Sequence, residues 1–346
     1  MKAAVLHAVG DLRVEEIPVP QPEQGEVLLR VGACGVCGSD IPRVFTKGTY
    51  SFPTIIGHEF AGTVVEVGPE GDMGLMGKRA AVFPLIPCRK CDACAAGAYA
   101  QCTDYDYLGS RCDGGFAEFV RVPEWNLLPL PDALSLEEAA MVEPAAVALH
   151  ALRRGQLEGG DSVMVFGAGP IGLLVALWAQ ALGAANVLVA DIDLDKLRFA
   201  KKLGFSQLFD PRQSDVGAWA QKKTGRGADL VIEASGSTAA YESAMTCART
   251  FGRVVLLGNP AGEMKLSQQA YWAILRKELQ LTGTWNSVYS DLPRNEWKMS
   301  IEYMANGKIN VNPLISHRIG LDGLGEHLAI MRDRTAFSNK IMYIND

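Results

Sequence analysis

The stretch that decides the fold is residues 163–191, VMVFGAGPIGLLVALWAQALGAANVLVAD. A short apolar run leads into a glycine-rich turn, then a helix-length apolar segment, then Gly183 and a second apolar run that ends on Asp191. The order of strand, glycine turn, helix, strand and acid is that of a βαβ unit that binds a dinucleotide. A lone G-x-G-x-x-G is a weak signal, and the flanking strands and helix give it weight here.

Each residue of the turn has a physical task. Gly167 permits a tight turn, Gly169 leaves room for a pyrophosphate, and Gly172 lets the helix approach the sheet closely. Pro170 suits the first helical turn, where its missing N–H costs nothing, and the free N–H groups there face the phosphates. The remaining residues expected beside the cofactor are Ile171 and Lys196.

The acid that closes the unit predicts which dinucleotide binds. Asp191 lies at the distance along the chain expected for a carboxylate that binds the ribose 2′-hydroxyl and repels a 2′-phosphate, so we expect NAD rather than NADP. Residues 162–190 are also uncharged and long enough to suggest a membrane span. The glycine turn and Pro170 divide this stretch into a strand-length piece and a helix-length piece, so the span is rejected.

Length and composition describe an ordinary globular protein. The chain has 346 residues, 48% hydrophobic and 21% charged, so two domains are expected. A formal net charge of −6 argues against nucleic acid or an anionic membrane as the main partner. Residues 1–6 are too short for a signal-peptide core, so we expect a cytoplasmic protein. Eight cysteines in such a protein indicate metal binding or catalysis more than disulfides.

The first part of the chain is predicted to form a mostly β domain. Short apolar runs between turns predict strands at residues 27–31, 62–68, 80–83 and 116–120. Residues 135–154 are helical in character, with Ser135 and Glu138 in the spacing of a capping box.

From Val163 onward, strands and helices alternate. A helix is expected at residues 195–203, and the strands after the first are expected at 187–190, 207–209, 230–233, 254–257 and 279–282. Six strands with helices between them predict a doubly wound parallel sheet. The mixed final sixty residues are expected to return to the first domain. We therefore place the catalytic domain at residues 1–146 and 286–346, with the NAD-binding domain, residues 147–285, inserted into it.

Four cysteines share one loop with the spacing C-x2-C-x2-C-x7-C: Cys88, Cys91, Cys94 and Cys102. Four thiolates form a closed tetrahedral zinc site, which stiffens the loop and leaves no position for a substrate. C-x2-C-x2-C also opens ferredoxin runs, but the expected Cys-Pro is missing. We expect Arg89, Lys90 and Arg111 to offset the negative charge of the thiolates.

A second set of metal-binding side chains is scattered along the chain. Cys37 lies in CGSD, His58 and Glu59 lie in GHEFAG, and Glu143 is expected at the end of an apolar helix. One Cys, one His and one carboxylate form a catalytic zinc site with a position open for water or substrate. Taken singly, a lone histidine is usually a satisfied polar residue, and Glu143 also suits a turn cap. Cys34 and Cys37 form a C-x-x-C, but the βαβ context of a thioredoxin motif is absent.

Together these motifs resemble the zinc-containing medium-chain dehydrogenases. CGSD, GHE, the four-cysteine loop and the glycine turn occur in the family's order and spacing, and the match covers the whole chain. The resemblance implies a Rossmann domain inserted into a GroES-like β domain, with zinc and NAD as cofactors. It implies that Cys37, His58 and Glu143 bind the catalytic zinc, with Glu59 as a nearby carboxylate that can join or exchange. Glu143 followed by Pro144 is typical of the polyol dehydrogenase branch.

Longer stretches resemble a branch that acts on polyol phosphates. They are CGSDIPRVF at 37–45, PLIPCRKCDAC at 84–94, YDYLGSRCDGGFAEF at 105–119 and LRKELQLTGTW at 275–285. The likeness implies that galactitol 1-phosphate is oxidised to tagatose 6-phosphate by hydride transfer to NAD. Many relatives have a proton-relaying histidine where this chain has Pro42, so the relay is expected to run through Ser39, a ribose hydroxyl or water, with Ser39 as the first proton acceptor.

A phosphorylated substrate needs cations in its pocket. By their nearness to the matched stretches, the expected substrate residues are Arg43, Lys47, Tyr50, Arg276 and Trp285. Arginine suits bidentate phosphate binding, although most Lys and Arg side chains face solvent. Two other classes of function stay open: a dehydrogenase for a free polyol or threonine, and a non-catalytic protein that binds zinc and a nucleotide. A homodimer or homotetramer is expected.

Overall fold

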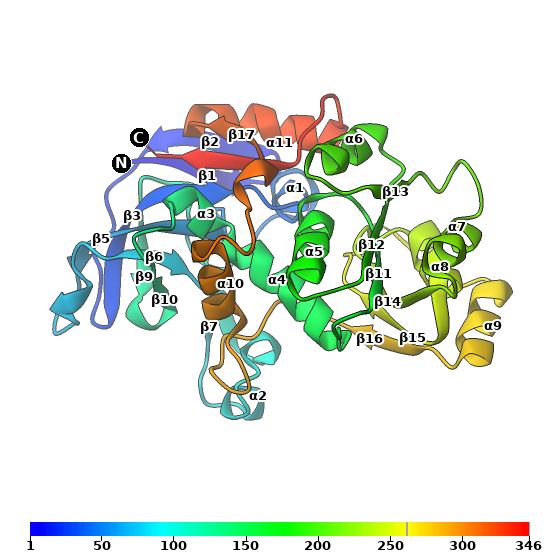
Figure 1. Ribbon diagram of the computed structural model, residues 1–346. Helices are drawn as coiled ribbons and strands as arrows, with labels where there is room; N and C mark the ends of the chain where they lie inside the picture. The colour runs from blue at the N-terminus through cyan, green and yellow to red at the C-terminus, as the bar shows by residue number, and fades with distance from the viewer. Residues whose placement is uncertain (261, 346) are drawn as a thin grey trace. The chain divides into compact units, whose positions relative to one another are not determined.

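The computed structural model describes residues 1–260 and 262–345 (Figure 1). The chain divides into two compact units, which we call unit 1 (Met1–Glu143 with Val288–Asp346) and unit 2 (Pro144–Ser287). The boundaries expected from the sequence, after residues 146 and 285, lie a few residues away from these. Every helix in the described part of the chain is too short or too polar for a transmembrane span.

Unit 1 consists mainly of antiparallel β-sheet. Over the described residues, its largest sheet has the strand order β10-β6-β5-β3-β18-β17, with β9 also paired to β3, and two smaller sheets have the orders β2-β1-β4 and β7-β8. The strands are β1 Lys2–Ala8, β2 Asp11–Glu16, β3 Glu26–Gly35, β4 Thr54–Ile55, β5 Glu59–Val67, β6 Arg79–Val82, β7 Leu85–Pro87, β8 Tyr105–Tyr107, β9 Phe119–Pro123, β10 Leu127–Pro129, β17 Ile315–Ile319 and β18 Lys340–Ile344.

The core of unit 1 joins segments that are distant in the chain. Leu29 and Val31 of β3 pack in one cluster with Phe60 of β5 and Ile341 of β18, all essentially inaccessible to solvent. Because β18 pairs with β3, the last part of the chain completes the sheet that residues near its start begin. The helical segments are α1 Asp40–Pro42, η1 Arg43–Lys47, η2 Met73–Leu75, α2 Asp92–Ala95, η3 Tyr99–Gln101, η4 Glu124–Asn126, α3 Leu136–Ala140, α10 Glu296–Ala305, η5 Asn312–Leu314, η6 Leu321–Gly323 and α11 Leu324–Asp333.

Unit 2 is a parallel sheet with helices on both faces. Within the described residues its strand order is β13-β12-β11-β14-β15-β16, and Figure 1 shows α5 on one side of the sheet with α8 and α9 on the other. The strands are β11 Ser162–Phe166, β12 Asn186–Ala190, β13 Gln207–Phe209, β14 Ala228–Glu233, β15 Ala248–Leu256 and β16 Gln280–Gly283. The helices are α4 Val142–Arg154, whose first two residues belong to unit 1, α5 Pro170–Ala181, α6 Leu194–Lys202, α7 Val216–Thr224, α8 Thr238–Cys247 and α9 Gln268–Lys277. The fold class expected from the sequence is confirmed.

Two details differ from the sequence expectation. The strand expected at 116–120 begins at Phe119, because Phe116 bonds to Ile56 and Ala117 bridges to Ala3 before the ladder with β3 starts. The helix expected at 135–154 is two helices, α3 with the predicted Ser135 capping box and α4, separated at Met141. Glu143 therefore lies in the first turn of α4, not at the end of a helix.

Candidate functional site

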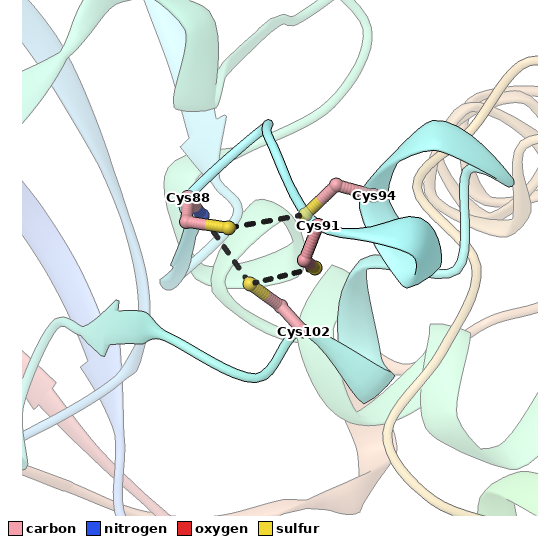
Figure 2. A group of neighbouring side chains, drawn as sticks. All are labelled: Cys88, Cys91, Cys94 and Cys102. Atoms are coloured by element: carbon pink, nitrogen blue, oxygen red, sulfur yellow. Dashed lines mark hydrogen bonds between the residues drawn. The ribbon is translucent and has the colours of Figure 1, made fainter.

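The four-cysteine loop brings its sulfur atoms together in unit 1. Cys88 follows β7, Cys91 caps α2, Cys94 lies within α2, and Cys102 follows η3. Their four Sγ atoms lie within 4.8 Å of one another, and the pairs Cys88–Cys94 and Cys91–Cys102 are each 3.9 Å apart (Figure 2). Four sulfurs at about 2.3 Å from one zinc ion are about 3.8 Å apart at the corners of a tetrahedron. The loop thus has the dimensions of a closed zinc site.

The electrostatics of this loop also suit a bound cation. Backbone N–H groups of Thr103 and Cys94 lower the pKa of the Cys91 thiol to about 6. Burial raises the pKa of the Cys94 thiol to about 12, and the neighbouring Cys102 and Cys91 sulfurs add to this. A divalent ion is what permits four such thiols to ionise together.

The cations expected to offset the thiolates lie elsewhere or contribute through their backbone. The Arg89 guanidinium lies 4.3 Å from the centre of the Trp125 ring, and the backbone N–H of Lys90 lowers the pKa of Cys88. The Arg111 side chain stacks over Tyr50 and Tyr105 instead. Backbone N–H groups of the loop therefore face the Cys88 and Cys91 sulfurs.

A second group of metal-ligating atoms is formed by Cys37, His58 and Glu59, which lie within 4.8 Å of one another. His58 and Glu59 are buried, with exposed fractions of 4% and 1%, and Cys37 is partly exposed. Cys37 follows β3, whereas His58 immediately precedes β5 and Glu59 begins it. One thiol, one imidazole and one carboxylate fit zinc with one position left open.

A polar network supports His58. Asp40 Oδ1 lies 3.5 Å from His58 Nδ1 and accepts a hydrogen bond of 2.9 Å from Arg43 Nη1, while Asp40 Oδ2 accepts one of 2.9 Å from the Cys37 N–H. Burial alone would raise the pKa of the Asp40 carboxyl, but His58 and Arg43 lower it to about 2. Arg43 Nη1 also donates to Ser39 Oγ at 2.9 Å. Arg43 is thereby directed toward the cluster, and the Ser39 hydroxyl is left free to donate its own proton.

Glu59 is held by a lysine from the last strand. Lys340 Nζ forms a buried ion pair with Glu59 Oε2 and donates to the Val36 carbonyl at 3.1 Å. Only 2% of the Lys340 side chain and 1% of the Glu59 side chain are exposed. A Cβ added to Gly35 would lie 2.3 Å from Glu59 Oε2, so β3 closes the other side of the carboxylate.

Glu143 lies near this cluster but is not one of its three members. Its Oε1 lies 3.5 Å from the Tyr107 hydroxyl, and the Tyr107 ring is 5.8 Å from the His58 ring. Burial raises the pKa of Glu143 to about 7; the nearby His58 charge lowers it and Glu59 raises it. The structure thus brings two carboxylates to the site, and Glu59 is the one grouped with Cys37 and His58.

In unit 2 the glycine turn has the geometry that a phosphate cradle needs. Gly167 has a φ of +102°, and a Cβ on Gly172 would lie 1.9 Å from the Gly167 carbonyl oxygen. Helix α5 begins at Pro170, with Ile171 in its first turn. Asp191 Oδ2 accepts a 2.7 Å hydrogen bond from the Ala168 N–H, which places the carboxylate against the turn.

The remaining predicted residues divide between the two units. Lys196 lies in α6, and its N–H donates to the α6 cap Asp193. Arg276 of α9 stacks on Trp272 at 4.0 Å, and Trp285 is 58% exposed; both belong to unit 2. Lys47 ends η1 and is exposed, and Tyr50 is 72% exposed; both belong to unit 1.

Three residues that lie beside the cluster, Asp40, Tyr107 and Lys340, were missed by the sequence analysis. Asp40 lies inside the quoted CGSD motif, so its short distance from Cys37 was an available signal. The sequence contained no comparable signal for Tyr107 or Lys340, because only the fold brings them to the cluster. Lys340 lies 281 residues beyond Glu59 in the chain.

Comparison with known proteins agrees with the fold and identifies the family of the chain. Residues 23–132 match the alcohol dehydrogenase GroES-like domain, and residues 170–306 match the zinc-binding dehydrogenase domain. Galactitol 1-phosphate 5-dehydrogenase of Escherichia coli (strain K12) is 35% identical over 99% of this chain and 100% of that protein. Sorbitol dehydrogenase of Bacillus subtilis (strain 168) is 33% identical over 93% of this chain and 91% of that protein. The crystal structure of galactitol-1-phosphate dehydrogenase from Escherichia coli matches with a TM-score of 0.93 and 35% identity over 100% of both chains.

The family expected from the motifs is confirmed: the chain belongs to the zinc-binding medium-chain dehydrogenases, oxidoreductases of alcohols and polyols whose cofactors are zinc and a nicotinamide dinucleotide.

Proposed function

We propose that this protein oxidises a secondary hydroxyl of a polyol phosphate with NAD, and specifically galactitol 1-phosphate to tagatose 6-phosphate. The observation that carries the reaction type is the group of Cys37, His58 and Glu59, with donor atoms within 4.8 Å of one another. The choice of substrate is supported by 35% identity over the full length to a galactitol 1-phosphate 5-dehydrogenase.

The residues in and around the cluster have different roles in the proposed reaction. Cys37, His58 and Glu59 would hold a zinc ion, and the ion would supply a Lewis acid that lowers the pKa of a substrate hydroxyl. Asp40 Oδ1 lies 3.5 Å from His58 Nδ1 and orients the imidazole, as groups behind a metal ligand do. Ser39 Oγ accepts from Arg43 and has its own proton to donate, so it suits the first step of a proton relay to solvent.

The preference for NAD over NADP rests on Asp191. Its carboxylate lies against the glycine turn, where it suits a ribose diol and repels a 2′-phosphate. The nearby Arg212 does not compensate, because its guanidinium forms two hydrogen bonds, of 2.8 and 2.9 Å, with the Asp210 carboxylate. No free guanidinium is therefore supplied by Arg212 for a 2′-phosphate.

The test is NAD reduction with matched pairs of substrates: galactitol 1-phosphate against galactitol, and sorbitol 6-phosphate against sorbitol. We expect a kcat/KM that is higher for each phosphate ester by at least about tenfold, with galactitol 1-phosphate the best of the four. Cys37→Ala serves as the inactive control. Equal turnover of phosphorylated and free polyols would overturn the substrate proposal while leaving a polyol dehydrogenase.

A free polyol is the second candidate. The 33% identity to a sorbitol dehydrogenase favours it. So does the engagement of Arg43, whose Nη1 is committed to Ser39 and Asp40 and so makes a weaker phosphate ligand than the sequence indicated. The same pairs of substrates decide between the two candidates.

A homodimer or homotetramer is also part of this proposal. Strand β16 pairs only with β15 among the described residues, so its other edge has unpaired N–H and C=O groups. Leu281 on this strand and Trp285 just beyond it are 36% and 58% exposed. Such an edge favours pairing with another chain. Light scattering should give a multiple of the chain mass, and Leu281→Lys should lower it.

A further inference from the structure

We propose that Arg111 is the residue that recognises the phosphate of the substrate, and that Tyr50 and Tyr105 hold its guanidinium in place. This inference rests on the proposed function and assigns to one residue of unit 1 the ligand chemistry that a polyol phosphate requires. It replaces Arg43 and Lys47, the two cations of this unit that the sequence indicated.

The Arg111 guanidinium is positioned by two aromatic rings. Its Cζ lies 4.1 Å from the centre of the Tyr50 ring and 4.3 Å from that of the Tyr105 ring. Each ring attracts the guanidinium by a cation–π interaction and holds it in place, and the N–H donors that the two tyrosines do not engage can bind a phosphate oxygen. An arginine held in this way loses little side-chain entropy when it binds an anion.

The charge of Arg111 lacks a counterion in the described part of the chain. No carboxylate there forms an ion pair with it, and its Nε is buried with no hydrogen-bond partner. An unpaired buried donor costs free energy that a hydrogen-bonding ligand recovers. By contrast, Arg13, Arg121 and Arg249 each pair with a carboxylate at 3.1 Å or less. Arg111 is therefore set up to receive an anion from outside the chain.

The loop that carries Arg111 also reaches the catalytic cluster. The Arg111 N–H donates to the Tyr107 carbonyl at 2.9 Å, and the Tyr107 ring packs against His58. Gly109 lies so close to Gly57, the residue before His58, that a Cβ added to it would be 2.3 Å from the Gly57 oxygen. The loop that carries Arg111 thus packs against the segment that carries His58, so a phosphate held by this loop and a hydroxyl at the cluster can belong to one polyol chain.

The two other cations suit this role less well. Arg43 Nη1 donates to Ser39 and Asp40, and only 20% of the side chain is exposed, so Arg43 is a positioning residue for the cluster. Lys47 is exposed at the end of η1 and shows no side-chain partner among the described residues. Lys47 is therefore the matched control: a nearby cation of the same unit that the proposal does not use.

The decisive experiment compares Arg111→Ala, Arg111→Lys and Lys47→Ala with the unmodified enzyme, each assayed with galactitol 1-phosphate and with galactitol. Arg111→Ala should lower kcat/KM for the phosphate ester by about 10- to 100-fold, the effect of one charge-assisted hydrogen bond, and by less than about threefold for galactitol. Arg111→Lys keeps the positive charge but loses the paired N–H donors of the guanidinium, so kcat/KM for the phosphate ester should fall by an intermediate factor. Lys47→Ala should leave both values unchanged.

A binding measurement separates this role from a structural one. Inorganic phosphate should inhibit the unmodified enzyme competitively against the phosphate ester, and its inhibition constant should rise about tenfold or more in Arg111→Ala but not in Lys47→Ala. Calorimetric titration of galactitol 1-phosphate into the same proteins should show the same order of affinities without turnover. Thermal unfolding of each variant checks that the loop still folds, and Arg111→Lys remains informative if Arg111→Ala does not.

The outcomes distinguish this inference from the proposed function. An unmodified enzyme that prefers the phosphate ester, combined with an Arg111→Ala variant that loses both substrates equally or neither, overturns the role of Arg111 alone. An unmodified enzyme with no preference for the ester and no inhibition by phosphate overturns the proposed function, and the role of Arg111 with it.

Discussion

The two groups of metal-ligating side chains in unit 1 are assembled in opposite ways. The four cysteines come from one loop, and backbone N–H groups of that loop help to ionise them. Cys37, His58 and Glu59 come from two segments and depend on Asp40, and on Lys340 from the end of the chain. A local group is fixed by spacing alone, whereas the dispersed group exists only once the sheet around it is complete. The first therefore suits a structural role and the second a reactive one.

The largest effect that tests this comparison comes from removing one cysteine from each group. Cys37→Ala should reduce turnover to background while leaving NAD binding and the thermal midpoint nearly unchanged, because unit 2 carries the glycine turn. Cys94→Ala should instead lower the thermal midpoint and increase proteolysis of the loop. Turnover assays, cofactor titration and calorimetric unfolding measure these effects. Near-normal turnover of Cys37→Ala would contradict a reactive role for its group.

Chelation should separate the groups without mutation. Fresh protein is expected to contain two zinc ions per chain, and a mild chelator should remove the ion at the open site first. Activity should then fall while far-UV circular dichroism is retained, and added zinc should restore it. A metal analysis that gives one zinc ion, or iron, would be inconsistent with two zinc sites.

The dispersed group should also be sensitive to its distant lysine. Lys340→Met leaves the buried Glu59 carboxylate unpaired, which typically costs about 3–5 kcal/mol of folding free energy. Denaturant unfolding should show this loss, and the double variant Lys340→Met with Glu59→Gln should recover part of it. The exposed Lys265, whose side chain is 72% accessible, provides the control: Lys265→Met should change stability by less than about 0.5 kcal/mol.

The smallest expected effect lies outside both groups, at the cofactor turn. Asp191→Ala should weaken NAD binding by about 1.5–3 kcal/mol, the range of a charge-assisted hydrogen bond, and narrow its advantage over NADP. Dissociation constants for both dinucleotides, measured by fluorescence titration, test this. An unmodified enzyme that binds NADP as tightly as NAD would refute the role of Asp191.

The parts of the molecule that the sequence predicted are those set by local patterns. The glycine turn, the Ser135 capping box and the four-cysteine loop depend on residues within one short segment, and all three have the predicted geometry. The ion pair between Lys340 and Glu59 and the stacking of Arg111 on Tyr50 were not predictable, because a buried lysine and an exposed tyrosine look ordinary in sequence. The hydrogen bond from Arg43 to Asp40 was not predictable either, since proximity along the chain does not reveal where the Arg43 side chain points.

The position of Lys340 late in the chain also determines when during synthesis the ion pair with Glu59 can form. On a ribosome that adds roughly 5–20 residues per second, Glu59 emerges about 15–60 s before the lysine that pairs with it 281 residues later. Until β18 arrives, the sheet of unit 1 lacks a strand and the Glu59 carboxylate lacks its cation. All of unit 2 is translated in that interval. The unit that begins first is therefore the one that finishes last, and its dispersed metal site is among the final features of the molecule to form.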